Sequence, residues 1–453
     1  MSYGVKSGGR SLQRFGYTSW PPYADQRLAA VRGQTFAQRS VGPWISAMQG
    51  VRRAAIVRPM TLEQLSALAQ IVGAGALLAS LIFVGLQIRQ NTQSQRVCHD
   101  TLPWLISFSL DRRSFMTKLC IANGEGLLVF EKKNSAWKVY VKLPKNLDHQ
   151  CIAIDPVKKD RAYCSTFEDG LWLTDDEGDI WKKVRSFPTK AGVTSVTVNP
   201  KEKNDGFGAV YAGTEPSMLY RSLDGGETWE KLDEFLSLPS SKSWSFPPKP
   251  DTHHVRNITI DPTKPGLIYL AIEAGALIRS FDYGKTWKDR VKTGPFDTHT
   301  LVANPNAEGR LYSAAGDGYF ESEDYGETWR RIDDGLNETY LYSVAVHPDD
   351  PDTILVSASP GPWTAYNALN AESRIYRRET GRVWKEVKKG LPDADGTTAS
   401  AIIANPKQMG TFYAANNTGI YVSEDKGASW EALPVPWNDS FRAQNVRTFA
   451  GWF

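Results

Sequence analysis

The chain has 453 residues, of which 41% are hydrophobic and 23% are charged, an ordinary composition for a globular protein. Its net charge of +3 is unevenly spread, because residues 1–115 hold 13 basic and 4 acidic side chains while residues 116–453 hold 40 basic and 46 acidic ones. The net-acidic larger part argues against nucleic acid as a partner, since nucleic-acid binding needs a basic face.

The N-terminal quarter is expected to differ from the rest. Residues 1–59 are rich in Gly, Ser, Arg and Gln without a sustained period, which predicts a disordered extension. Residues 60–96 contain an uncharged apolar run at 65–88, which as a helix would reach roughly 36 Å and could span a bilayer. A buried or amphipathic helix is the alternative. Residues 97–115 are expected to be a linker.

The origin of this quarter is a separate hypothesis. Met60 and Met116 each open a stretch that looks like a protein start, and the segment from 60 to about 95 resembles the N-terminal helix of small bacterial membrane proteins. We therefore expect residues 1–115 to be a fusion or a mis-extended reading frame. Membrane association through residues 65–88 is expected only if this helix is authentic.

Four cysteines lie at or before the first two repeats described below, at positions 98, 120, 151 and 164. They show neither CxxC spacing nor a framework spread along the chain, and Cys120, Cys151 and Cys164 lie in apolar, strand-like runs. This pattern predicts buried free thiols. Free thiols fit a reducing compartment, so we expect residues 116–453 to be cytoplasmic.

A tryptophan-closed motif repeats along residues 116–453. Tryptophan recurs 42 to 58 residues apart, a spacing typical of four-stranded propeller blades. The positions are Trp137, Trp181, Trp229, Trp287, Trp329, Trp384 and Trp430. Four clean copies of a Ser-x-Asp-x-Gly-x-Thr/Ser-Trp motif begin at Ser222, Ser280, Ser322 and Ser423, a near copy begins at Thr174, and the copies ending at Trp137 and Trp384 are degenerate.

This motif resembles the Asp-box, or BNR, repeat of sialidase-like propellers. The resemblance implies an all-β fold, a seven-bladed β-propeller over residues 116–453. An Asp such as Asp224 can accept hydrogen bonds from its own turn, and Gly226 supplies a conformation that a Cβ would penalise. The boxes are therefore expected to be structural rather than catalytic.

A second signature precedes most boxes: an apolar strand ending in Asp, Asn or His before Pro, as at Asp155-Pro156 and Asp261-Pro262. The first blade lacks this strand. The C-terminal residues 445–450 match the sequence around Arg256, so we expect them to supply the missing inner strand and to close the ring.

Polar residues gather where inner strands should begin and second strands should end, at the expected channel mouth. Before the inner strands lie Asp148, His149, Gln150, His253, His254, Arg256, Asp297, His299, Tyr340, Tyr342 and Arg447. After the second strands lie Glu215, Glu273, Asp317, Asn416 and Asn417. Such a set predicts a polar ligand pocket.

Two long insertions flank this expected pocket. Residues 233–254 carry Trp244, and residues 359–373 carry Trp363 and Tyr366. Exposed aromatic side chains there would stack on sugars or clamp a peptide; capping the propeller face is the alternative. The predicted ligand-binding residues are His149, Trp244, His253, His254, Arg256, His299, Tyr342, Trp363, Asn416 and Arg447.

Three functions stay open. The first is a binding scaffold for a glycan or a protein, and we expect the chain to be a monomer. The second is a glycoside hydrolase or lyase using the carboxylate pair Glu273 and Asp317. The third is a metal site formed by His149, His254, His299 and Glu273, although no local ligand spacing supports it and neither a metal nor a cofactor is assigned. The sequence also resembles a broad group of bacterial and archaeal glycosyl-hydrolase-like BNR propellers.

Overall fold

The computed structural model describes residues 118–453 except for residue 189. The expectations for residues 1–115, namely the extension, the apolar helix at 65–88 and the linker, lie outside the described residues. Within 118–188 and 190–453, no helix has both the length and the apolar character that a membrane crossing requires.

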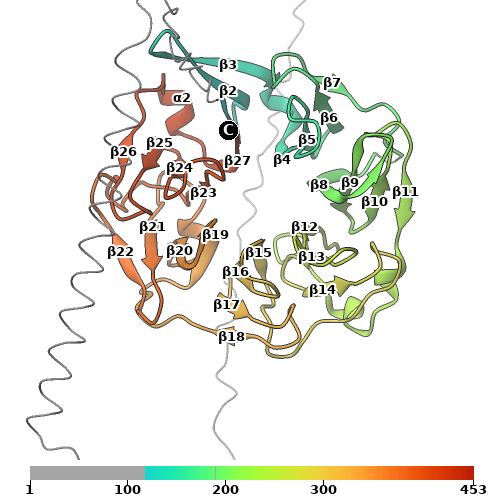
Figure 1. Cartoon of the computed structure of the whole chain (residues 1–453). Helices are drawn as coiled ribbons and strands as arrows, with labels where there is room; N and C mark the ends of the chain where they lie inside the picture. The colour runs from blue at the N-terminus through green and yellow to red at the C-terminus, as the bar shows by residue number, and fades with distance from the viewer. Residues whose placement is uncertain (1–117, 189) are drawn as a thin grey trace, which may run out of the picture. The chain divides into compact units, whose positions relative to one another are not determined.

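Seven β-sheets form a ring in this part of the chain, as Figure 1 shows, and each sheet is one blade of a propeller. Blades 2 to 7 follow chain order, with the first strand of each blade nearest the centre of the ring. The all-β, seven-bladed prediction is confirmed.

The first three blades have four strands each. Blade 1 has the order β27 (Val446–Trp452), β1 (Lys118–Asn123), β2 (Gly126–Lys133) and β3 (Ala136–Pro144). After the 3-10 turn η1 (Lys145–Leu147), blade 2 contains β4 (His149–Ile154), β5 (Ala162–Thr166), β6 (Gly170–Thr174) and β7 (Lys182–Lys183). Blade 3 contains β8 (Gly192–Asn204), β9 (Phe207–Glu215), β10 (Leu219–Ser222) and β11 (Glu230–Leu232), followed by η2 (Glu234–Ser237) and η3 (Pro239–Ser243).

Blade 4 is the exception, with three strands and one isolated bridge between Arg279 and Lys288 in place of a fourth. It contains β12 (Val255–Ile260), β13 (Ile268–Ile272) and β14 (Ala276–Ser280). Blade 5 contains β15 (Thr298–Ala303), β16 (Leu311–Ala315), β17 (Gly318–Ser322) and β18 (Arg330–Arg331). Blade 6 contains β19 (Tyr340–His347), β20 (Asp350–Ser359), β21 (Arg374–Arg378) and β22 (Lys385–Val387), with η4 (Pro362–Thr364) in its insertion. Blade 7 contains β23 (Ala401–Ala404), β24 (Phe412–Asn416), β25 (Gly419–Ser423) and β26 (Glu431–Ala432), followed by α2 (Asp439–Arg442).

The core is divided among the interfaces between blades. Among the described residues there are seven buried hydrophobic clusters, one for each pair of neighbouring blades. Adjacent residues of one strand serve different interfaces, because side chains of a strand alternate between its two faces. Thus Leu119 and Ile121 pack toward blade 7, whereas Cys120 and Ala122 pack toward blade 2.

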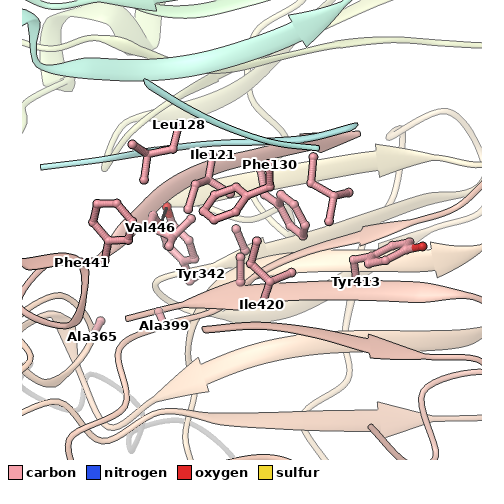
Figure 2. Packing of buried hydrophobic residues seen from close by; sticks show 14 residues of the cluster. Ile121, Leu128, Phe130, Tyr342, Ala365, Ala399, Tyr413, Ile420, Phe441 and Val446 are labelled. Atoms are coloured by element: carbon pink, nitrogen blue, oxygen red, sulfur yellow. Dashed lines mark hydrogen bonds between the residues drawn. The ribbon is translucent and has the colours of Figure 1, made fainter. Parts of the chain in front are cut away.

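The ring closes through the C-terminal strand, as predicted. β27 pairs antiparallel with β1, with Ile121 opposite Phe449. Figure 2 shows the cluster that this closure buries, in which Ile121, Leu128 and Phe130 of blade 1 meet Ile420 of blade 7. The closing contact is therefore a packed interface as well as a hydrogen-bonded strand pair.

The Asp boxes are local turns held by their own side chains. Asp224 Oδ1 accepts hydrogen bonds from the Ser222 hydroxyl at 2.7 Å and from the Thr228 amide at 2.9 Å. Burial alone would raise the pKa of Asp224, but these hydrogen bonds, with that from the Thr228 hydroxyl, lower it to about 2. Gly226 has φ +104° and Trp229 Nε1 donates to its carbonyl at 3.1 Å. The predicted structural role is confirmed in geometry. The copy at Thr174 repeats the contacts of Ser222, of the Thr228 amide and of Trp229, but Ile180 replaces Thr228 and so supplies no hydroxyl.

Cys120, Cys151 and Cys164 are free thiols, as predicted, and burial raises the pKa of each. Cys120 and Cys164 are fully buried, while Cys151 is partly exposed. Cys98 lies outside the described residues.

Candidate functional site

A charged cluster forms where blades 3, 4 and 5 meet at one end of their inner strands. We call it the Glu273 cluster and define it as Glu273, His254, Arg256, Asp297 and His299. His254 directly precedes β12 and Glu273 directly follows β13; these two strands are antiparallel, with Val255 opposite Ile272. The same arrangement places Asp297 and His299 at the start of β15 in the next blade.

Glu273 is the centre of this cluster, and its side chain is 17% exposed. Its Oε2 lies 2.7 Å from His254 Nε2 and 3.4 Å from Arg256 Nε. Its Oε1 lies 4.0 Å from His299 Nε2. Burial alone would raise the pKa of Glu273, but the hydrogen bond from His254 and the charge of Arg256 lower it to about 2. Glu273 is therefore a carboxylate at any physiological pH, and His254 donates to it through Nε2–H.

His299 is held in a fixed orientation. Its side chain has no exposed area, and its Nδ1 lies 2.6 Å from the Leu341 carbonyl oxygen, so Nδ1 carries a hydrogen. Its Nε2 lies 3.6 Å from Asp297 Oδ2 and makes no hydrogen bond within the described part of the protein. The Nε2 atom thus faces the two carboxylates of Glu273 and Asp297.

A second layer supports His254. Glu215, the last residue of β9, has Oε2 3.4 Å from His254 Nδ1 and Oε1 3.1 Å from Lys249 Nζ. The Phe246 ring packs edge-on against the His254 imidazole, with ring centres 4.7 Å apart. The insertion after blade 3 therefore contacts His254 directly through Phe246 and holds Glu215 beside it through Lys249.

Tyrosines border the cluster on the side of blade 6. The Tyr340 and Tyr366 hydroxyls are 2.8 Å apart, and the Tyr340 ring centre lies 5.0 Å from that of His299. The Tyr342 hydroxyl donates to the Arg447 carbonyl at 2.6 Å, and the Arg256 guanidinium lies 5.8 Å from the Tyr342 ring centre. Tyr342 therefore links blades 4, 6 and 1, and burial raises its pKa.

Asp317 accepts hydrogen bonds from the backbone of a neighbouring loop. Its Oδ2 accepts from the Phe296 amide at 3.2 Å and its Oδ1 from the Asp297 amide at 3.1 Å. Burial raises its pKa, and the backbone hydrogen bonds oppose this shift. The sequence paired Asp317 with Glu273, but the structure brings Asp297 there instead: the ligand atoms of Glu273, Asp297 and His299 all lie within 4.8 Å of one another.

Three other predicted ligand residues lie outside the Glu273 cluster. His149 is buried with both ring nitrogens lacking hydrogen-bond partners in the described structure, and burial lowers its pKa to about 4. It is not in the convergent group, so its predicted part in a shared metal site is wrong. Arg447 forms an ion pair with Asp148. His253 Nδ1 lies 2.8 Å from the Ser217 hydroxyl.

The aromatic insertions differ from each other. Trp244 is only 5% exposed, packs on Phe235 and donates to the Ser240 hydroxyl at 3.0 Å, so the expectation of an exposed ring there is wrong. This insertion folds back over blades 3 and 4 and buries its indole in their interface. Trp363 is 60% exposed, as expected.

Two cavities stand apart from the Glu273 cluster. One of about 620 Å³ lies between blades 6 and 7, and Arg374 on its wall forms ion pairs with Glu338, Glu372 and Glu386. Asn416 is the only predicted ligand residue on that wall, and its side-chain amide donates to the Ser400 hydroxyl at 3.1 Å. The second, of about 350 Å³, lies at the Asp-Pro ends of β8, β12 and β15. The expected pocket at the opposite strand ends is therefore a charged cluster and neither of these cavities.

The sequence pattern and the structure agree with a known repeat. The family model described as "BNR/Asp-box repeat" matches residues 220–231, which contain the box from Ser222 to Trp229. The chain is thus a seven-bladed propeller that carries a BNR/Asp-box repeat at residues 220–231.

Curated relatives of this Asp-box propeller are xyloglucanases. A xyloglucanase of a Paenibacillus species is 25% identical over 276 residues, covering 56% of this chain and 22% of the relative. Xyloglucanase Xgh74A of Acetivibrio thermocellus is 26% identical over 299 residues, covering 54% of this chain and 33% of the relative. The chain thus spans about a fifth to a third of the length of these relatives.

Solved structures support the fold. A GH74 enzyme of Niastella koreensis superposes with a TM-score of 0.52 at 17% identity, covering 69% of this chain and 51% of that one. An ancestral GH74 enzyme gives a TM-score of 0.50 at 16% identity, covering 65% and 39%. At such identities the likeness concerns the architecture of the propeller.

Proposed function

We propose that this propeller is a glycoside hydrolase that acts on a polysaccharide of the xyloglucan type, at the Glu273 cluster. Its curated relatives are named xyloglucanases, which suggests the substrate class. The observation that carries the proposal is the pairing of an ionised carboxylate, Glu273, with a second carboxylate, Asp297, whose oxygens approach within 4.8 Å.

Two carboxylates at this separation suit one type of glycoside hydrolysis. Retaining enzymes hold their carboxyl groups about 5–5.5 Å apart, whereas inverting enzymes separate them by about 6.5–9.5 Å to admit a water. The spacing of Glu273 and Asp297 is nearer to the retaining arrangement. We therefore expect the products to keep the anomeric configuration of the substrate.

The environment of Glu273 suggests which of the two groups is the nucleophile. Glu273, with a pKa of about 2, is always available as the nucleophile that attacks the anomeric carbon. Asp297 would donate its proton to the leaving glycosidic oxygen and then take a proton from the water that hydrolyses the glycosyl–Glu273 ester. Arg256 and His254 hold Glu273 in place, and Asp317 holds the Asp297 backbone.

The test is release of reducing ends from xyloglucan and a panel of other polysaccharides by the full chain. Glu273→Gln and Asp297→Asn should each lower kcat at least about 100-fold, as expected for loss of a nucleophile or a general acid. Glu323→Gln, at an exposed Asp-box position in blade 5, is the control and should retain full activity. A native chain that cleaves nothing in the panel would refute the proposal, and unsaturated products would identify a lyase instead.

A binding scaffold is the second candidate, and one observation favours it. Both Glu273 and Asp317 already accept hydrogen bonds from protein groups, and Asp297 Oδ1 accepts from the Ala274 amide at 2.8 Å. Carboxylates that are fixed by hydrogen bonds can form a rigid ligand-binding surface as readily as a catalytic site. Calorimetry showing that a glycan binds to the native chain without turnover, with binding lost in Glu273→Gln, would favour the scaffold.

A further inference from the structure

Three ligand atoms of the Glu273 cluster converge without being joined to one another by hydrogen bonds. They are Glu273 Oε1, Asp297 Oδ2 and His299 Nε2, and the imidazole nitrogen lies 4.0 Å and 3.6 Å from the two oxygens. From this geometry we infer a binding site for a divalent transition-metal ion, with Zn²⁺ as the best-fitting ion.

The spacing of the three atoms is close to that of a metal site. Zinc ligands of nitrogen and oxygen type lie about 2.0–2.2 Å from the ion, and at tetrahedral angles such atoms are about 3.4 Å apart. The nitrogen–oxygen separations of 3.6 Å and 4.0 Å exceed this by about 0.2 and 0.6 Å, and the two carboxylate oxygens lie within 4.8 Å of one another. Small side-chain rotations of Glu273 and Asp297 would therefore bring all three atoms into coordination.

His299 has the features of an oriented metal ligand. Its Nδ1–H donates to the Leu341 carbonyl, so Nε2 is the ring nitrogen that faces the carboxylates and that an ion would bind. Metal-bound histidines are held by such an outer hydrogen bond as a rule. The side chain is completely buried, and its Nε2 has no hydrogen-bond partner among the described residues. A buried nitrogen left unsatisfied costs free energy, and a cation would remove that cost.

On each of the two carboxylates, one oxygen is left for the ion. On Glu273, Oε2 carries the contacts to His254 and Arg256, which leaves Oε1 for the ion. On Asp297, Oδ1 accepts from the Ala274 amide, which leaves Oδ2. Two carboxylates supply enough negative charge to hold a divalent cation beside the positive charge of Arg256.

The donor set selects among ions. Mg²⁺ and Ca²⁺ prefer six or more oxygen ligands, whereas an imidazole suits Zn²⁺ and its neighbours in the first transition series. Three protein ligands leave a fourth tetrahedral position for water or for a hydroxyl of a bound ligand.

The inference goes beyond the proposed hydrolysis and stands independently of it. An ion bound here would take both carboxylates away from nucleophilic attack and proton transfer. Zinc binding and the proposed hydrolysis should therefore exclude each other, so that saturating Zn²⁺ abolishes turnover and a chelator restores it.

The test measures Zn²⁺ itself on untagged full chain that has been stripped with a chelator. Calorimetry with ZnCl₂ and metal analysis after gel filtration should give one bound zinc that is lost, or weakened at least about 10-fold, in His299→Gln and in Asp297→Asn. His347→Gln, which removes another buried histidine in blade 6, is the matched control and should bind like the native chain. MgCl₂ in the same titration should give no comparable binding.

The outcomes separate the two proposals. A native chain that retains no zinc, or zinc binding that survives both His299→Gln and Asp297→Asn, would overturn the metal site. If His299→Gln fails to fold, as judged by circular dichroism, Asp297→Asn decides. Zinc binding by a chain that cleaves no glycan even after zinc has been stripped from it would support the metal site and reject the hydrolase. Turnover by a chain that binds no zinc would do the reverse.

Discussion

The closing strand β27 should be essential for the stability of the whole ring, and Phe449→Ala tests this. Phe449 is 7% exposed and lies opposite Ile121, in the cluster that blades 7 and 1 share (Figure 2). Removing a buried phenylalanine ring costs about 3–5 kcal/mol, through the lost transfer free energy and the cavity left behind. Single-domain proteins have a total stability of about 5–15 kcal/mol, so this substitution should remove a large share of it.

The assay is urea unfolding of the full chain, followed by tryptophan fluorescence. Phe449→Ala should lower the urea midpoint well below that of the native chain without changing the slope of the transition. The matched control is Leu369→Ala, because Leu369 is 95% exposed and its loss should change stability by no more than about 0.5 kcal/mol. Deleting residues 440–453 removes Val446 and Trp452 as well, and should abolish the cooperative transition altogether.

Equal urea midpoints for Phe449→Ala and Leu369→Ala would refute the reasoning. That result would mean that the ring tolerates an open interface between blades 7 and 1, and that β27 does not act as its closing strand.

Three further predictions concern single groups. Asp324→Ala should cost about 1–2 kcal/mol of unfolding free energy, because Asp324 accepts hydrogen bonds from Ser322 and Thr328. The control substitution Glu323→Ala, at the exposed neighbouring residue, should cost less than about 0.5 kcal/mol. Equal urea midpoints for the two variants would contradict a structural Asp box. Glu273 has a folded pKa of about 2, below the ordinary value near 4.3, so its stabilising contribution is complete above pH 4.3 and is lost as the pH falls toward 2. The difference in urea midpoint between the native chain and Glu273→Gln should therefore be constant from pH 7 to 5 and shrink below about pH 4. A difference that grows in acid would contradict this argument. Cys120 and Cys164 are buried thiols with raised pKa, so iodoacetamide at pH 8 should label them only when urea has unfolded the chain. Peptide mass spectrometry would measure the labelling. Rapid labelling of the folded chain would contradict the burial of these thiols.

The sequence predicted the repeat architecture because its signals are local. Each Asp box is stabilised by contacts within four residues, such as those from Ser222 and Thr228 to Asp224, so the motif is visible wherever it occurs. The closing strand was also predictable, since residues 445–450 match the sequence around Arg256 in another inner strand and the first blade lacks such a strand.

The candidate site was predictable only in outline. Strand ends identified Glu273, His254, Arg256, Asp297 and His299 as residues at one end of the ring, and the structure brings these five together. The sequence pattern paired Glu273 with Asp317, and nothing local in the sequence pointed to Asp297 as the partner. The choice of partner depends on the loop before β15, which Asp317 fixes by accepting two backbone amides and which then directs Asp297 toward blade 4.

Burial of the long insertions was likewise decided by tertiary structure. Trp244 and Trp363 look alike in sequence, each in an irregular stretch among Pro and Ser or Gly, yet one ring is buried between blades 3 and 4 and the other is largely exposed. Local sequence thus determined the blades, their number and their closure, because turns and strand alternation act over a few residues. Only the packing of distant blades decided which side chains meet, because those contacts depend on how each loop folds back over its neighbours.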